Sequence, residues 1–132
     1  MPYFQPVILL VEDDPNDRRL LQWALQKSEL PFTLKIAADG EQAIDFLSRS
    51  AEPLSLTLSD VHLPKKSGWD VLEWIRRQPA RLSMPVLMWT SLPNPEGERR
   101  ALQLGATSYF SKPLSADGYR KVVAVIEEHL RD

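Results

Sequence analysis

Four apolar stretches of the sequence each end in polar side chains that could take part in metal or phosphoryl chemistry. In chain order these are the acidic cluster Glu12, Asp13 and Asp14, the carboxylate Asp60, the hydroxyl pair Thr90 and Ser91, and the lysine Lys112. Carboxylate oxygens are suitable ligands for Mg²⁺, whereas hydroxyl and ammonium groups can donate hydrogen bonds to a phosphoryl group. The residue types therefore predict a site for a divalent cation and a phosphoryl group, provided that the fold brings these four chain segments together.

The alternation of apolar and amphipathic segments indicates how these side chains are positioned. Short apolar runs predict strands at residues 6–12, 32–37, 54–60, 85–90 and 107–111, and a longer amphipathic segment follows each of them. Repeated strand–helix units of this kind form a parallel sheet flanked by helices. Because the carboxyl ends of such strands open onto one crevice, we expect the four polar groups to lie close together.

Capping residues mark the ends of the predicted helices. Asp14 stands directly before Pro15, an arrangement typical of the N-cap of a helix over residues 15–27, and this favours a structural role for Asp14 over metal binding. Asp39 and Gln42 have the spacing of a capping box at the start of the second helix. Gly105 is expected to follow a helix over residues 96–104 as its C′ residue. A last helix is predicted from the regularly spaced apolar residues Tyr119, Val122, Val123, Ile126 and Leu130.

The composition is that of one globular domain. The chain has 132 residues, of which 43% are hydrophobic and 26% charged, and its net charge is −2. This charge favours neither nucleic acid nor an anionic membrane as a partner. No apolar run approaches the roughly 20 residues that span a bilayer, and the first residues lack the features of a signal peptide. Without cysteine, disulfides and thiolate chemistry are excluded. We therefore expect a cytoplasmic protein.

Four segments resemble the receiver domains of two-component response regulators, which have the CheY-like fold. They are residues 10–17 (LVEDDPND), 60–68 (DVHLPKKSG), 85–91 (PVLMWTS) and 105–113 (GATSYFSKP). The resemblance extends from Val7 to Leu130. It implies a single receiver domain over residues 1–132, with its core at about residues 7–130 and no output domain. The implied architecture is a doubly wound, flavodoxin-like α/β fold with five parallel strands in the order 2-1-3-4-5.

The resemblance also implies a function for the acidic residues. In such domains an aspartate accepts a phosphoryl group from the phosphohistidine of a sensor histidine kinase, and Asp60 matches this aspartate. Mg²⁺ assists the transfer by neutralising charge between carboxylate and phosphoryl oxygens. The matching metal ligands are Asp60, Asp13 directly, Glu12 through water, and the backbone carbonyl of His62. The first and second matching segments look most like those of stand-alone regulators that partner phytochrome-type kinases. We expect a signalling domain, not an enzyme.

Further positions match the parts of the family that respond to phosphorylation. Thr90 matches a hydroxyl that turns toward the phosphoryl group, although Ser91 offers the same group one residue later. Lys112 matches the lysine that pairs with the active-site carboxylate and then with the phosphoryl group, and its bond to Pro113 is expected to be cis. Tyr109 matches an aromatic side chain that moves with the hydroxyl, but simple packing of an aromatic in a strand is equally compatible with the sequence.

Two features bear on the surface that partners would contact. Trp89 stands where the family has a smaller aliphatic residue, and the sequence leaves open whether it is buried or faces the fourth helix. The family signals through the face formed by the fourth helix, fifth strand and last helix. The apolar residues Leu114, Tyr119 and Val123 near this face favour a homodimer there.

Two other functions stay open at this point. Dehalogenase-like phosphatases also form an aspartyl phosphate with Asp, Lys and Mg²⁺ on a doubly wound fold. They need a second acidic residue two positions after the nucleophile, where this chain has His62. The other alternative is a pseudo-receiver that only docks partners, and the complete set of matching site residues argues against it.

Overall fold

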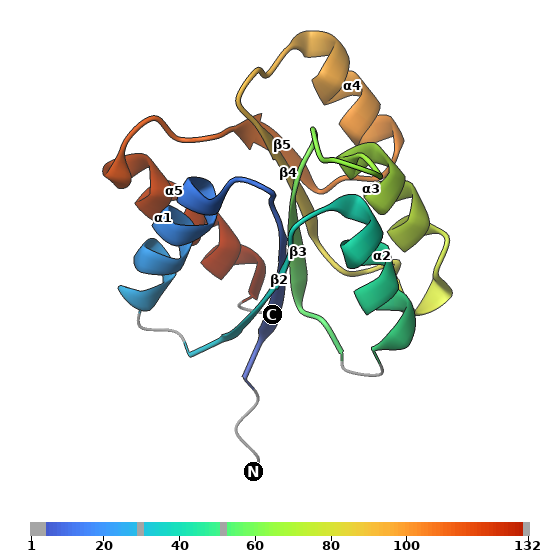
Figure 1. Cartoon of the computed structure of the whole chain (residues 1–132), viewed down its shortest axis with the longest axis horizontal. Coiled ribbons are helices and arrows are strands. Elements are labelled where there is room, and N and C mark those ends of the chain that lie inside the picture. Colours follow the sequence, from blue (N-terminus) through green and yellow to red (C-terminus); the bar gives the residue numbers. More distant parts are fainter. Residues whose placement is uncertain (1–4, 29–30, 51–52, 131–132) are drawn as a thin grey trace.

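The computed structural model describes residues 5–28, 31–50 and 53–130, and its centre is a five-stranded parallel sheet (Figure 1). The strands are β1 (Val7–Val11), β2 (Thr33–Ala37), β3 (Leu56–Asp60), β4 (Val86–Thr90) and β5 (Ser108–Ser111). Their order in the sheet is β2-β1-β3-β4-β5, and each neighbouring pair is parallel. The doubly wound fold and the strand order expected from the sequence are confirmed, and the predicted strand bounds agree to within two residues.

Helices cover both faces of this sheet. In the described part of the chain they are α1 (Pro15–Gln26), α2 (Gly40–Arg49), α3 (Gly68–Arg76), α4 (Pro95–Gln103) and α5 (Ala116–Leu130), with a short 3₁₀ helix at Pro79–Arg81. Helices α1 and α5 lie side by side on one face, and α2, α3 and α4 lie on the other (Figure 1). None of these helices combines the length and apolar character needed to cross a membrane.

The interior strand β1 is buried on both faces, which accounts for its uninterrupted apolar sequence. Ile8 and Leu10 pack into the cluster beneath α1 and α5, whereas Leu9 and Val11 pack into the cluster beneath α2, α3 and α4. Successive side chains of a strand point to opposite faces, and a parallel strand covered on both sides therefore has no polar face. In β1 the polar residues Glu12 and Asp13 follow directly after the end of the strand, where the candidate site lies.

The predicted helix caps are largely present. Asp14 is the N-cap of α1, and its Oδ1 accepts a hydrogen bond of 2.8 Å from the backbone N–H of the second helical residue. Asp39 caps α2 by accepting from the N–H of Gln42 at 2.7 Å. The return bond of the expected capping box is shifted by one residue, because the Gln42 side chain accepts from the N–H of Ala38. Gly105 follows α4 with φ +98°, a conformation that glycine adopts without steric cost.

Trp89 is buried on the face covered by α1 and α5. Its ring packs edge-on against that of Tyr119 on α5, with a centroid separation of 6.0 Å and an interplanar angle of 87°. Tyr119 and Val123, which the sequence analysis placed near a dimer face, are only 2% and 6% exposed. Their helical spacing is that of the core-facing stripe of α5, so neither is available for a subunit contact. Leu114 alone of the three is fully exposed.

The expectation of a cis bond between Lys112 and Pro113 is wrong for this structure. No peptide bond in the described residues is cis. The dipeptide does not itself encode the isomer, since the trans form of an X–Pro bond is intrinsically favoured by about 0.5–1 kcal/mol. Strand β5 still delivers Lys112 to the site with a trans bond, because the Lys112 N–H donates to the carbonyl of Thr90 at 2.8 Å and fixes its backbone.

Candidate functional site

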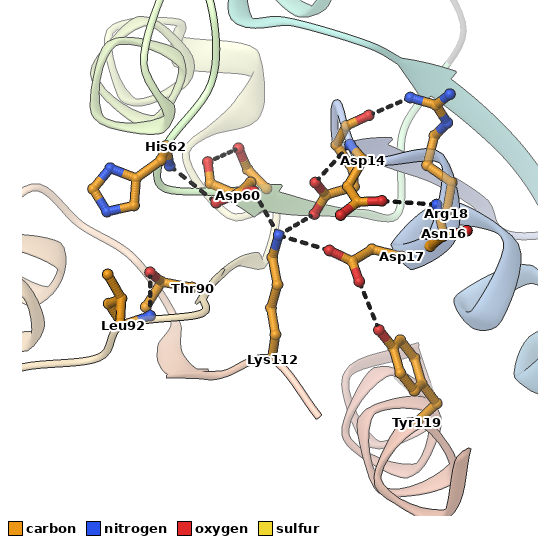
Figure 2. A network of polar contacts seen from close by, with 12 residues as sticks. Asp14, Asn16, Asp17, Arg18, Asp60, His62, Thr90, Leu92, Lys112 and Tyr119 are labelled. Carbon is orange, nitrogen blue, oxygen red and sulfur yellow. Dashed lines mark hydrogen bonds and ion pairs between the residues drawn. The ribbon is translucent and has the colours of Figure 1, made fainter. Parts of the chain in front are cut away.

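The carboxyl ends of β1, β3, β4 and β5 meet at one edge of the sheet. The register pairs Asp60 with Trp89, the residue before Thr90, and pairs Thr90 with Ser111, the residue before Lys112. Each strand therefore presents its polar residue at nearly the same level. Figure 2 shows Asp60 and Asp17 turned toward the ammonium group of Lys112. The convergence expected from the sequence is thus present.

Lys112 occupies the centre of this group. Its Nζ lies 2.7 Å from Asp60 Oδ2, 2.9 Å from Glu12 Oε1 and 2.9 Å from Asp17 Oδ2. Burial alone would lower the pKa of Lys112, but the hydrogen bonds to Asp60, Asp17 and Glu12 outweigh it and raise the pKa above its ordinary value. The side chain, which is only 9% exposed, therefore carries a permanent positive charge at physiological pH.

Asp60 is held by groups on both of its oxygens. Oδ1 accepts a hydrogen bond of 2.9 Å from the backbone N–H of His62, and Oδ2 accepts from Lys112. The chain then turns back so that α3 begins against the strand end, with the Gly68 N–H donating to the carbonyl of Val61 at 2.9 Å. A Cβ on Gly68 would lie 2.0 Å from the backbone oxygen of Asp60, so the close approach requires glycine. The carboxylate is therefore fixed in direction by the backbone around it.

Glu12 is fully buried beside this carboxylate. Its Oε2 accepts from the N–H of Asp14 at 3.1 Å, and its backbone oxygen accepts from Arg18 at 2.8 Å. Burial raises the pKa of Glu12 to about 7; the ion pair with Lys112 opposes this rise and the charge of Asp60 adds to it. At neutral pH Glu12 is therefore poised between its charged and neutral forms.

Three carboxylates form a candidate site for a cation. Glu12, Asp13 and Asp60 each offer one oxygen within 4.8 Å of the others, with Asp13 exposed to solvent. Asp17 adds a fourth carboxylate nearby, and the ammonium of Lys112 pairs with Glu12, Asp60 and Asp17. This excess of negative charge and the all-oxygen donor set suit a divalent cation such as Mg²⁺. Asp14 is not in the group, in agreement with the capping role expected for it.

Thr90 lies at the end of β4 and is 1% exposed, whereas Ser91 is exposed. Its Oγ1 accepts a hydrogen bond of 3.2 Å from the N–H of Leu92, which begins the loop leading to α4 (Figure 2). The Thr90 hydroxyl is thus bound to the start of this loop, while the Thr90 carbonyl accepts from the Lys112 N–H. A movement of Thr90 would act directly on the segment that precedes α4.

Tyr109 links β5 to the beginning of α4. Its hydroxyl accepts from the N–H of Asn94, the N-cap of α4, at 3.2 Å. A Cβ on Gly97 would lie 2.4 Å from this hydroxyl, so the helix and the ring pack closely. The half-buried ring also lines a groove of about 310 Å³ together with His62 and Trp69. Tyr109 therefore contacts α4 in this structure, and its predicted movement stays a prediction.

Sequence reasoning missed two residues of this network, Asp17 and Tyr119. Asp17 bridges Lys112 and the Tyr119 hydroxyl, which donates to its Oδ1 at 3.0 Å. The sequence placed Asp17 in the first turn of a helix, where acidic residues are common, and assigned Tyr119 to an apolar stripe. The available signal was positional, since the first turn of α1 begins directly after the acidic cluster and so must lie beside the site.

The sequence of this chain is similar to those of known proteins. The family model of the response regulator receiver domain matches residues 8–124. The response regulator Rcp1 of Synechocystis sp. is 35% identical over 126 residues, covering 92% of this chain and 86% of Rcp1. The sensor histidine kinase RcsC of Salmonella typhi is 36% identical over 125 residues, but this chain spans only 13% of that kinase.

Solved structures extend the likeness to the fold. The phosphorylated cyanobacterial phytochrome response regulator RcpA has a TM-score of 0.87 and 31% identity, covering 95% of this chain and 93% of RcpA. The Mn²⁺-bound form of Rcp1 has a TM-score of 0.83 and 34% identity, covering 93% of this chain and 92% of Rcp1. The similarity therefore includes almost the whole described sheet and its helices.

Proposed function

Because this chain belongs to the response regulator receiver domain family, we propose that Asp60 accepts a phosphoryl group from a histidine kinase and that this switches the protein's signalling state. Members of this family act as signalling domains of two-component systems. One observation carries the assignment: the buried carboxylate of Asp60 lies between the ammonium of Lys112 and a cluster of carboxylates suited to a cation. This is the environment that an aspartate needs to attack an anionic phosphoryl group.

The proposed transfer is a substitution at phosphorus. A carboxylate oxygen of Asp60 forms a bond to phosphorus as the bond between phosphorus and the histidine nitrogen breaks, and the imidazole keeps the electron pair. In the later hydrolysis, water attacks phosphorus and the Asp60 carboxylate leaves. Lys112 supplies a positive charge and N–H donors to the phosphoryl oxygens during both steps. Mg²⁺ would supply charge neutralisation between the carboxylate and phosphoryl oxygens, which otherwise repel each other.

The metal ligands proposed for Mg²⁺ are Asp13 and Asp60 directly, Glu12 through water, and the backbone carbonyl of His62. The proximity of the three carboxylates supports this set, as does the Mn²⁺-bound state of the relative Rcp1. Asp13 is exposed, so a cation bound to it would be accessible to water, whereas Glu12 is fully buried.

Thr90 and Tyr109 are the proposed route from the site to the surface. When Thr90 turns toward a phosphoryl oxygen, its bond to the Leu92 N–H is lost and the loop before α4 is released. Tyr109 holds the N-cap of α4 and would respond to that release. The surface formed by α4, β5 and α5 would then differ between the two states, which is what a partner must detect.

The proposed kinase is of the phytochrome type. The likeness to Rcp1 and RcpA supports this, since RcpA is described as a phytochrome response regulator. A homodimer through α4, β5 and α5 is also proposed, supported by the exposure of Leu102 and Leu114 near that surface. Sedimentation that gives a monomer mass at every concentration, with and without a phosphoryl analogue, would exclude the dimer.

The phosphoacceptor is tested by intact mass after incubation with a small acyl phosphate such as acetyl phosphate. We expect a phosphoryl adduct in the wild type with Mg²⁺, and no adduct either without Mg²⁺ or in Asp60→Asn. Asp117→Asn, which removes an exposed carboxylate from the first turn of α5, is the matched control and should be phosphorylated normally. An adduct in Asp60→Asn would move the phosphoacceptor elsewhere. No adduct from either an acyl phosphate or a phosphohistidine donor would favour the docking-module alternative.

A further inference from the structure

Asp17 connects the lysine of the site to the core of the protein. One carboxylate oxygen, Oδ2, lies 2.9 Å from Lys112 Nζ, and the other accepts a hydrogen bond of 3.0 Å from the Tyr119 hydroxyl (Figure 2). These contacts join residues 95 and 102 positions apart in the sequence. The Asp17 side chain is 18% exposed, so solvent only partly screens the ion pair. The first turn of α1, the end of β5 and α5 are therefore joined at this carboxylate.

Asp17 differs from the other two partners of Lys112. An ammonium group has three N–H donors; that of Lys112 donates hydrogen bonds to Asp17 and Asp60 and forms an ion pair of 2.9 Å with Glu12. Glu12 and Asp60 also belong to the candidate cation cluster, and among the described residues that cluster does not include Asp17. A cation and a phosphoryl group would draw on the charge of Glu12 and Asp60. Asp17 is then the one partner that stays dedicated to Lys112.

The position of Asp17 is itself fixed from the core. Tyr119 is 2% exposed, and its ring is held edge-on against the buried ring of Trp89. The Trp89 ring in turn lies 5.6 Å from Lys112 Nζ, within the range of a cation–π contact. Burial and the neighbouring Asp17 carboxylate raise the pKa of Tyr119, so its hydroxyl keeps the proton that it donates. The ammonium therefore rests between a fixed carboxylate and a fixed ring.

We propose that Asp17 is a positioning residue that holds the Lys112 ammonium in place for the phosphoryl group on Asp60, and that Tyr119 acts by holding Asp17. The proposal rests on the proposed function of Asp60. When an Asp60 oxygen bonds to phosphorus, the N–H of Lys112 that pointed to Asp60 turns to a phosphoryl oxygen, while the N–H to Asp17 stays in place. Without Asp17, the Lys112 ammonium is no longer held in the orientation that phosphoryl transfer to Asp60 needs.

The first test compares phosphorylation of Asp17→Asn and wild type by acetyl phosphate with saturating Mg²⁺. We expect the maximal rate to fall about tenfold, in line with the loss of one charged hydrogen bond, while the KM for acetyl phosphate stays unchanged. Asp14→Asn is the matched control, because it removes a carboxylate from the same turn and keeps a good N-cap, and because the carboxylates that pair with Lys112 are those of Glu12, Asp17 and Asp60. A normal maximal rate in Asp17→Asn, or an equal fall in Asp14→Asn, would overturn the proposal.

A second test needs neither a phosphoryl donor nor Mg²⁺. The ammonium protons of Lys112 should exchange with water at least several-fold faster in Asp17→Asn than in wild type or Asp14→Asn, as measured by NMR of lysine Nζ groups. Equal exchange rates would contradict the positioning role even if every phosphorylation experiment failed. This separates failure of the inference from failure of the proposed function, which is shown instead by a wild type that takes no phosphoryl group.

Tyr119→Phe provides the third test, because it keeps the ring against Trp89 and removes only the hydroxyl. The maximal phosphorylation rate should fall in the same direction but less than in Asp17→Asn. Since Tyr119 acts through Asp17, the double variant should be no slower than Asp17→Asn alone. If the two substitutions instead slowed phosphorylation independently, so that their effects multiplied in the double variant, Tyr119 would not act through Asp17. If Asp17→Asn does not fold, a Tyr119→Phe protein with the wild-type rate and the wild-type Lys112 exchange overturns the proposal by itself.

Discussion

The ammonium group of Lys112 lies 5.6 Å from the centroid of the Trp89 ring; Trp89 belongs to β4, and Lys112 directly follows the neighbouring strand β5. Trp89 is fully buried, and in the described residues its indole N–H has no hydrogen-bond partner. Its surroundings are thus set by packing against Tyr119 and by the nearby charge of Lys112. An indole in such a setting is sensitive to any displacement of the ammonium.

We therefore predict that Trp89 reports phosphorylation optically. Movement of Lys112 toward a phosphoryl oxygen changes the field at the ring, so the tryptophan emission of the wild type should change on addition of acetyl phosphate and Mg²⁺. The chain has four tryptophans, and Trp89→Phe isolates the contribution of the other three. A response that persists unchanged in Trp89→Phe would assign the signal to another tryptophan.

Lys112 also has a structural role that can be measured without a phosphoryl donor. In Lys112→Met the side-chain length is kept, but Glu12, Asp17 and Asp60 lose the cation that they share. Because unpaired buried charges are costly, we expect the free energy of unfolding to fall by about 3 kcal/mol in Mg²⁺-free buffer. Urea denaturation measures this, with the exposed Lys121→Met as control. Equal stabilities of Lys112→Met and wild type would mean that protonation or hydration of the carboxylates compensates for the loss of the cation.

The raised pKa of Glu12 predicts a specific dependence of stability on pH. The folded-state pKa of about 7 lies above the ordinary value of 4.5, so between these values the folded protein binds a proton that the unfolded chain does not. This contribution to stability is complete below pH 4.5 and is lost as the pH rises through 7. Without divalent cations, the wild type should lose on the order of 2 kcal/mol relative to Glu12→Gln over this range.

Urea denaturation of both proteins at pH 5, 6, 7 and 8 checks this difference. Comparison with Glu12→Gln removes the contributions of the groups that are common to both proteins. Saturating Mg²⁺ is expected to abolish the difference between the two proteins in how the free energy of unfolding depends on pH, because a bound cation favours the ionised form of Glu12. Parallel pH profiles without Mg²⁺ would show that Glu12 stays charged beside Lys112.

Most of the site follows from the sequence because it lies at strand ends. The apolar runs specify the strands, and a parallel sheet brings Glu12, Asp60, Thr90 and Lys112 to one edge whatever the details of packing. The identity of the sheet partners, by contrast, came from the resemblance to a family. Periodicity alone does not give strand order.

The parts that the sequence did not predict depend on three-dimensional packing. An acidic residue in the first turn of a helix looks the same in sequence whether it faces solvent or, like Asp17, pairs with a lysine 95 residues away. The face to which Trp89 points depends on the strand's pleat and on the room left by its neighbours. Tyr119 and Val123 looked available for a dimer because an apolar residue on a helix can face either the core or a second subunit. The sequence alone does not distinguish these two cases, whereas the burial of both side chains does.

The close approach of α3 to the strand end makes Gly68, the first residue of α3, a restrictive position after Asp60. In Gly68→Ala the new Cβ would lie 2.0 Å from the Asp60 backbone oxygen and 2.9 Å from the Val61 Cα, so the backbone must shift. Overpacking of this kind costs about 1–3 kcal/mol, which urea denaturation would detect. Because the His62 N–H that orients Asp60 belongs to the same turn, we also expect slower phosphorylation. Ser67→Ala, which removes the α3 cap without adding volume, should lower stability and leave the phosphorylation rate nearly unchanged; equal rates in Gly68→Ala would show that the turn does not orient the carboxylate.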